Sequence, residues 1–104
     1  MVERVIKLLR SSQISLSDEA TAQRDIAMLL KTAGIEYVRE CRLNARDIPD
    51  FMIGGLCVEV KLQGSKKKIF RQLVRYAKHS IVERILLVSG VSMGLPQQDR
   101  KSVV

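Results

Sequence analysis

The sequence lacks the features that mark several large classes of protein. Hydrophobic residues make up 46% of the chain, yet no stretch approaches the roughly 20 consecutive apolar residues that a membrane-spanning helix requires. The N-terminal segment is too charged for the apolar part of a secretory signal. No internal repeat or low-complexity segment is present. With 104 residues, the chain is predicted to be one soluble, cytoplasmic domain with a small core and no membrane partner.

Cysteine and histidine are scarce. Cys41 and Cys57 show no CxxC spacing and no nearby histidine pattern, which argues against a zinc site. Buried thiols are the default interpretation. A disulfide between them stays open, although a reducing cytosol disfavours it. His79 is the only histidine, and a surface or helix-end role is preferred for it over catalysis.

Acidic residues are missing from one long segment. The formal net charge is +7, from 18 basic and 11 acidic residues. No acid lies between Glu59 and Glu83, where seven cations occur: Lys61, Lys66, Lys67, Lys68, Arg71, Arg75 and Lys78. The whole excess charge therefore belongs to this segment, as expected of a protein that binds a phosphate backbone. The alternative is a solvated basic helix, but such faces usually interleave acids. Arg42 and Arg46 are interpreted as solvated unless they line a groove.

The stretch from Ile48 to Leu62 is predicted to be a β-hairpin. Two apolar runs flank Gly54-Gly55, and glycine tolerates the positive φ of a two-residue primed turn. The resulting pairs are Ile53 with Leu56, Met52 with Cys57, Phe51 with Val58 and Asp50 with Glu59. Because side chains alternate along a strand, Asp50, Glu59 and Lys61 are expected on one face.

Two carboxylates that face each other in an apolar hairpin repel one another, so something must offset the repulsion. A divalent cation such as Mg²⁺ or Mn²⁺ suits Asp and Glu oxygens, and Lys61 would hold a water or a phosphate oxygen beside it. The plainer alternative is an exposed hairpin in which Glu59 and Lys61 form a surface pair. The additional Asp50 in register favours a site.

The remaining patterns complete an α/β fold of order α-α-β-β-β-α-β. Helices are predicted over residues 2–10, 17–33 and 66–80, and strands over 35–43 and 84–89, the last parallel to the Glu59 strand. Residues 17–89 are the expected core of one domain spanning 1–104, and 90–104 the expected loose tail. Glu19 extends the apolar stripe of its helix, so it either points into the site or complements the helix dipole.

Two motifs carry a resemblance to a known family. Pro49-Asp50, eight further residues and Glu59-Val60-Lys61 resemble the signature of the PD-(D/E)XK nucleases. Gln72-Leu73-Val74-Arg75-Tyr76, on the next helix, resembles the Q-x-x-x-Y motif of RecB-type nucleases. Together with Glu19, this combination is more similar to virus-type and RecB-like repair nucleases or junction resolvases than to restriction enzymes.

The resemblance implies a restriction-endonuclease-like core, a mixed sheet flanked by helices, and a Mg²⁺- or Mn²⁺-dependent deoxyribonuclease. A minimal domain offers little area for reading bases, so a structure- or end-specific endonuclease acting on DNA is expected. The small core and the functional need for two cuts predict a homodimer. The implied catalytic residues are Asp50, Glu59, Lys61 and Glu19. The implied metal ligands are Asp50, Glu59, the Val60 carbonyl and Glu19. The implied nucleic-acid contacts are Gln72 and Tyr76. The cations expected from the charge distribution to hold the backbone are Lys66, Lys67, Lys68, Arg71 and Arg75.

Two alternatives belong to other classes. A non-catalytic DNA-binding module that keeps the nuclease fold would bind with salt dependence but without turnover. A basic interaction protein with no nucleic-acid role would leave the register of Asp50 with Glu59 unexplained.

Overall fold

A computed structural model describes residues 2–90 of the chain. Its elements are α1 (Val2–Arg10), α2 (Glu19–Thr32), β1 (Val38–Arg39), β2 (Phe51–Ile53), β3 (Leu56–Lys61), α3 (Lys66–Ala77) and β4 (Arg84–Ser89). This is a small α/β protein, and the order of its elements is the predicted one. No helix within residues 2–90 has both the length and the apolar character needed to cross a membrane.

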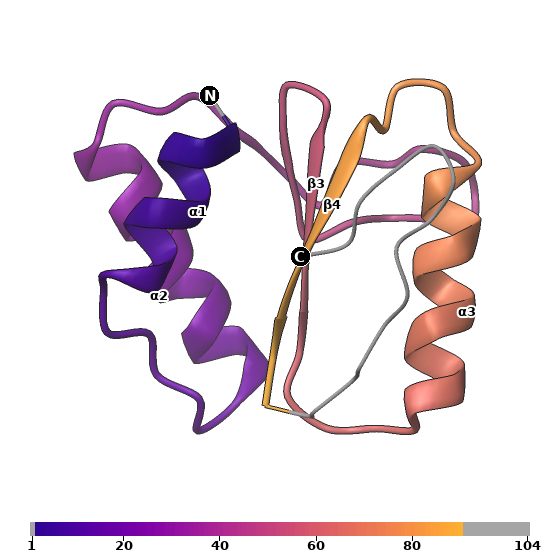
Figure 1. The fold of residues 1–104 in the computed structure, drawn as a ribbon, viewed down its shortest axis with the longest axis horizontal. Coiled ribbons are helices and arrows are strands. Elements are labelled where there is room, and N and C mark those ends of the chain that lie inside the picture. The colour runs from indigo at the N-terminus through magenta and orange to yellow at the C-terminus, as the bar shows by residue number, and fades with distance from the viewer. Residues whose placement is uncertain (1, 91–104) are drawn as a thin grey trace.

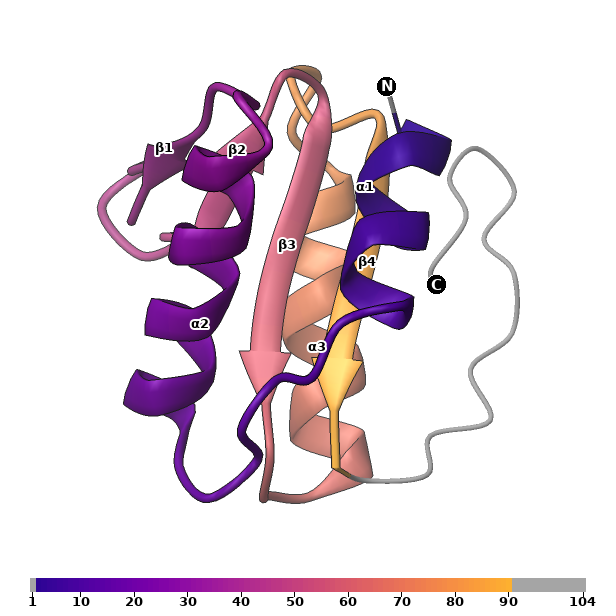
Figure 2. The ribbon, with the colours of Figure 1, turned by 90° about the vertical axis from the view of Figure 1, so that its left-hand side faces the viewer.

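The molecule has three layers. The strands form one mixed sheet in the order β1-β2-β3-β4, in which β3 and β4 are parallel and the other neighbours antiparallel. Seen edge-on, the sheet has α1 and α2 on one side and α3 on the other (Figure 1). The view turned by 90° shows β3 in the middle with α2 and α1 in front of the sheet (Figure 2). The parallel pairing of β3 with β4, joined through α3, confirms the predicted crossover.

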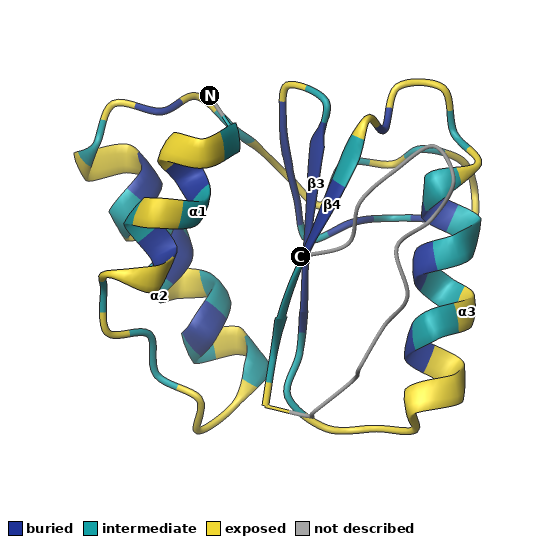
Figure 3. Ribbon diagram, viewed as in Figure 1, coloured by how far each residue is buried: buried dark blue, intermediate teal, exposed yellow. Residues whose placement is uncertain are grey.

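Strand β3 is the centre of the core. Five of its six residues are buried, as expected of a strand covered on both faces. Leu56, Val58 and Val60 pack toward α1 and α2, whereas Cys57 packs toward α3. The buried colour follows the strands and the inner sides of the helices (Figure 3). Because side chains alternate along a strand, Glu59 continues the face of Cys57 and points to the α3 side.

The hairpin has the predicted register. Ile53 pairs with Leu56, Met52 with Cys57 and Phe51 with Val58. Gly54 has a φ of 58°, a conformation that costs side-chain-bearing residues energy and that glycine adopts freely. Gly55 accepts hydrogen bonds on its carbonyl from the backbone N–H groups of Glu83 and Arg84, at 2.8 and 3.2 Å. The turn is therefore tied to the start of β4.

The predicted strand over residues 35–43 is wrong in its extent. Only Val38–Arg39 pairs with β2. The pairing ends at Glu40, which has a φ of 48° and donates its backbone N–H to the Asp50 carbonyl at 2.9 Å. A left-handed residue breaks the extended geometry that a strand needs, and alternating hydrophobicity does not reveal this.

The helix ends shift slightly from the predicted ones. Helix α2 begins at Glu19, capped by Asp18, whose carboxylate accepts the Thr21 backbone N–H at 2.7 Å. Helix α3 ends at Ala77 rather than at residue 80. Cys41 and Cys57 are not joined by a disulfide; Cys57 is buried and Cys41 half-buried. The predicted tail, apart from Gly90, lies outside the described residues.

Candidate active site and cationic pocket

The candidate site lies just before β2, where β3 continues past its last partner in β2 and is paired only with β4. Beyond that point, carboxylates replace the missing strand as hydrogen-bond acceptors for the β3 backbone. Asp50 Oδ2 accepts the Val60 N–H at 2.8 Å, and Glu19 Oε2 accepts the Leu62 N–H at 3.2 Å. Three segments, namely the α2 N-terminus, the residue before β2 and the end of β3, therefore meet at one edge.

Asp50 and Glu59 are linked reciprocally across the hairpin. While Asp50 accepts from the backbone of β3, its own backbone N–H donates to Glu59 Oε1 at 3.1 Å. Glu59 is only 3% exposed. Burial raises the pKa of Glu59 to about 7, and the negative charge of Asp50 adds to this effect. Burial likewise raises the pKa of Asp50. The predicted carboxylate pair is therefore a desolvated, mutually repelling pair.

Lys61 is the nearest cation to this pair. Its Nζ lies 3.7 Å from Glu59 Oε2, and its side chain is 28% exposed. The positive charge of Lys61 opposes the rise in the pKa of both carboxyl groups. Lys61 therefore connects the buried carboxylates to solvent, on the face of the sheet where α3 lies.

The donor atoms at this edge suit a hard divalent cation. In an antiparallel pair the N–H and C=O of one residue point to the same neighbour, so the Val60 carbonyl faces the same edge as its N–H, toward Asp50. Each carboxylate uses one oxygen on a backbone N–H and has a second oxygen. Two carboxylates and a carbonyl are ligands that Mg²⁺ and Mn²⁺ accept.

Glu19 lies beside the pair, close enough for its charge to raise the pKa of Asp50 and Glu59. Within residues 2–90, however, no three Asp, Glu, His or Cys side chains are grouped so as to hold a metal ion. Glu19 accepts the Leu62 backbone N–H, and its place among the metal ligands stays a prediction.

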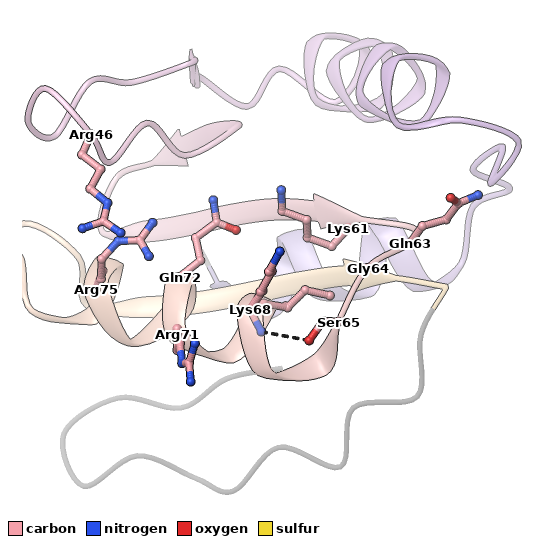
Figure 4. A pocket seen from close by; sticks show the side chains of 10 residues that line it. Arg46, Lys61, Gln63, Gly64, Ser65, Lys68, Arg71, Gln72 and Arg75 are labelled. Atoms are coloured by element: carbon pink, nitrogen blue, oxygen red, sulfur yellow. Dashed lines mark hydrogen bonds between the residues drawn. The ribbon is translucent and has the colours of Figure 1, made fainter.

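A cationic pocket of about 460 Å³ includes Lys61 in its lining and extends along α3 (Figure 4). It is lined by Arg46, Lys61, Gln63, Gly64, Ser65, Lys68, Ile69, Arg71, Gln72 and Arg75. Five of these residues are cations and none is an acid. The α3 residues among them include Lys68, Arg71, Gln72 and Arg75, whose spacing of three, four and seven places them on one helix face. The segment of the sequence without acidic residues thus lines much of a positively charged pocket.

The structure separates the predicted phosphate contacts into two groups. Lys68, Arg71 and Arg75 line the pocket, whereas Lys66 and Lys67 are exposed and lie outside its lining. Arg46 was expected to be solvated, but it lines the pocket from the loop before β2. Only its position opposite α3 reveals this role.

Gln72 and Tyr76 form a pair on α3. Gln72 Nε2 donates to the Tyr76 hydroxyl at 2.9 Å. Tyr76 is 1% exposed, and burial, followed by the charge of Glu59, raises the pKa of its hydroxyl. The contact of Tyr76 with nucleic acid stays a prediction, for a residue that is buried in the protein alone. Gln72 lines the pocket, and the buried Tyr76 hydroxyl accepts a hydrogen bond from its side chain.

Asp47 is a buried acid whose role the sequence did not reveal. Its carboxylate is bonded by Arg75 Nε at 3.0 Å and by His79 Nε2 at 2.8 Å. The hydrogen bond with His79, and then that with Arg75, lowers the pKa of Asp47. Asn44 shapes this loop, since its Oδ1 accepts the backbone N–H of Asp47 at 2.7 Å. The Asn44-x-x-Asp47 spacing was the available signal. His79 has the helix-end role expected of it.

Comparisons of the chain with protein-family models, with curated proteins and with solved structures find no match.

Proposed function

We propose that this protein is a divalent-metal-dependent nuclease that hydrolyses phosphodiester bonds in DNA. The observation that carries the proposal is the desolvated Asp50–Glu59 pair with Lys61 3.7 Å from Glu59, opening beside a pocket lined by five cations. A buried pair of like charges calls for a cation, and the pocket suits the phosphates that such a cation would activate.

Asp50, Glu59 and the Val60 carbonyl would hold Mg²⁺ or Mn²⁺, with Glu19 joining them only if it left the Leu62 backbone. When bound, the ion supplies Lewis-acid stabilisation of the charge that develops on the phosphoryl oxygens. The hydrogen bonds that Val60 and Asp50 donate from their backbones hold the two carboxylates in place. Glu59 must lose its proton before it binds a cation.

Lys61 is assigned to the attacking water and the developing phosphorane charge. It lies at the boundary between the carboxylates and the pocket, with its side chain partly open to solvent. An ammonium group there would orient the water and stabilise negative charge as the phosphate is attacked. Gln72 and the cations Lys68, Arg71 and Arg75 would hold the DNA backbone beside it.

Cleavage assays with purified variants test this function. The substrates are labelled four-way junction, flap, duplex and single-stranded DNA and RNA, incubated with Mg²⁺, Mn²⁺ or EDTA. Wild-type protein is expected to cut at least one DNA structure in a metal-dependent way. Asp50→Asn and Lys61→Met are expected to lose cutting by at least a hundredfold, consistent with the loss of a transition-state contact. Both are expected to stay folded.

Lys66→Met is the matched control, because it removes the same charge from an exposed position outside the pocket. It is expected to keep most of the activity. Full cutting by Asp50→Asn, or equal losses in Lys61→Met and Lys66→Met, would contradict the assignment.

A DNA-binding module without catalysis is the second candidate, favoured by the cationic pocket alone. It predicts salt-dependent binding with no cutting at any metal or pH. Homodimerisation stays a prediction, to be tested by the mass in solution.

A further inference from the structure

We propose that Arg46 and Arg75 form a second phosphate-binding point, which engages a phosphate of the same DNA strand other than the one that is cut. This inference deepens the proposed nuclease function and depends on it for the position of the cut. It assigns a role to Arg46 and predicts that a DNA strand lies along the pocket, from the end with Lys61 and Lys68 to the end with Arg46 and Arg75.

The two arginines come from different elements and meet at one end of the pocket. Arg46 belongs to the loop before β2, and Arg75 to the last turn of α3. Their guanidinium groups point toward one another in Figure 4, away from the end of the pocket where Lys61 and Lys68 lie. Two like charges that converge in a hollow without lining acids would be relieved by an anion between them.

Asp47 fixes the position of Arg75 without filling the space between the two arginines. It is 4% exposed, and the contact that it receives from Arg75 is made by Nε. A guanidinium has five N–H donors, so a bond through Nε leaves the terminal nitrogens to face the pocket. Asp47 also bonds His79, so its single negative charge is shared between two partners. Since Arg46 is the residue next to Asp47 in the chain, the same anchor positions both arginines.

The length of α3 sets the distance between the two ends of the pocket. Lys68 and Arg75 are separated by seven residues, which corresponds to about 10 Å along the helix at about 1.5 Å per residue. The Arg46–Arg75 end of the pocket is therefore farther from the Lys61–Lys68 end than one phosphate group can span. A single phosphate cannot bridge both ends, whereas a continuous strand can.

The test uses Arg46→Gln, with Arg42→Gln as its matched control. Both arginines are exposed and lie in the same segment before β2, and Arg42 lies outside the pocket lining. Each variant removes one positive charge, so a general charge effect appears equally in both. Arg46 is preferred to Arg75 because removing Arg75 would also deprive the buried Asp47 of a partner.

The first measurement is cleavage, in Mg²⁺, of a set of DNA strands that each carry one neutral methylphosphonate linkage at a different position. In wild-type protein a neutral linkage displaced to one side of the cut bond is expected to suppress cleavage of that bond by roughly tenfold, the loss expected of a charged hydrogen bond. Arg46→Gln is expected to lose this displaced suppression and Arg42→Gln to keep it.

The second measurement is binding of the uncut strand in EDTA over a range of salt concentrations. Arg46→Gln is expected to lower the slope of log affinity against log salt by about one, and Arg42→Gln to leave it unchanged. If the two variants behave alike in both measurements, the second phosphate-binding point is wrong even though cleavage continues. If nothing is cut but only Arg46→Gln lowers the salt slope, the nuclease proposal fails and the phosphate-binding point stands. If wild-type protein binds no nucleic acid, both fail.

Discussion

Replacing Glu59 by Gln should stabilise the metal-free protein at high pH. Glu59 is buried against Asp50, and its pKa rises from 4.5 to about 7. One pKa unit of difference between the folded and unfolded chain is worth about 1.4 kcal/mol, so this difference corresponds to roughly 3 kcal/mol. The stabilising contribution of protonated Glu59 is complete below pH 4.5 and is lost as the pH rises through about 7.

Glutamine keeps an oxygen that accepts the Asp50 backbone N–H but never ionises. The free energy of unfolding of Glu59→Gln, relative to wild type, is therefore expected to improve by roughly 3 kcal/mol between pH 4.5 and pH 8. The assay is urea denaturation in EDTA at several pH values across this range. Glu36→Gln is the control, because Glu36 is exposed and lies away from the pair. It should follow wild type.

The same variant connects stability with the proposed metal site. At pH 8, Mg²⁺ or Mn²⁺ at one hundred times its dissociation constant would add about 2.7 kcal/mol to wild-type protein. Glu59→Gln, which loses an anionic ligand, is expected to gain much less. Parallel pH profiles for wild type and Glu59→Gln in EDTA would refute the reasoning that Glu59 is a desolvated acid. Equal stabilisation of both proteins by the metal would refute its role as a ligand.

Two further predictions concern the structure around the site. Asp47→Ala should cost about 1–3 kcal/mol at neutral pH, because Arg75 and His79 lose a buried acceptor. Because the pKa of Asp47 is lowered in the folded protein, the stabilising contribution of its carboxylate is present above pH 3.8 and disappears as the pH falls through the lower folded value. The free energies of unfolding of wild type and Asp47→Ala, measured by urea denaturation, should therefore converge in acid. A constant difference between them would contradict this. Gly54→Ala should cost about 1 kcal/mol, since its φ is positive, and Gly54→Asn should cost less; unchanged melting temperatures would show that the turn tolerates another conformation.

Local patterns in the sequence determined the hairpin and its face. Once Gly54-Gly55 is the turn, a period of two fixes every cross-strand pair, because a slip of one residue would move the apolar residues of β3 to the wrong face. The same period places Glu59 and Lys61 together. The parallel pairing of β4 also followed from the sequence, since a strand, a helix and a second strand connect with one favoured hand.

Positions that depend on how distant segments pack were decided only by the tertiary structure. Glu19 meets Leu62, 43 residues along the chain, because the first residue of α2 lies beside the end of β3. Arg46 lines the pocket because α3 lies against the loop before β2, and Tyr76 is buried because α3 packs on this side of the sheet. Helical spacing alone does not show which flank of a helix the sheet covers. The sequence by itself thus determined which charged residues share a strand face. The packing of helices and loops on the sheet decided which of them are buried, which are paired and which face the pocket.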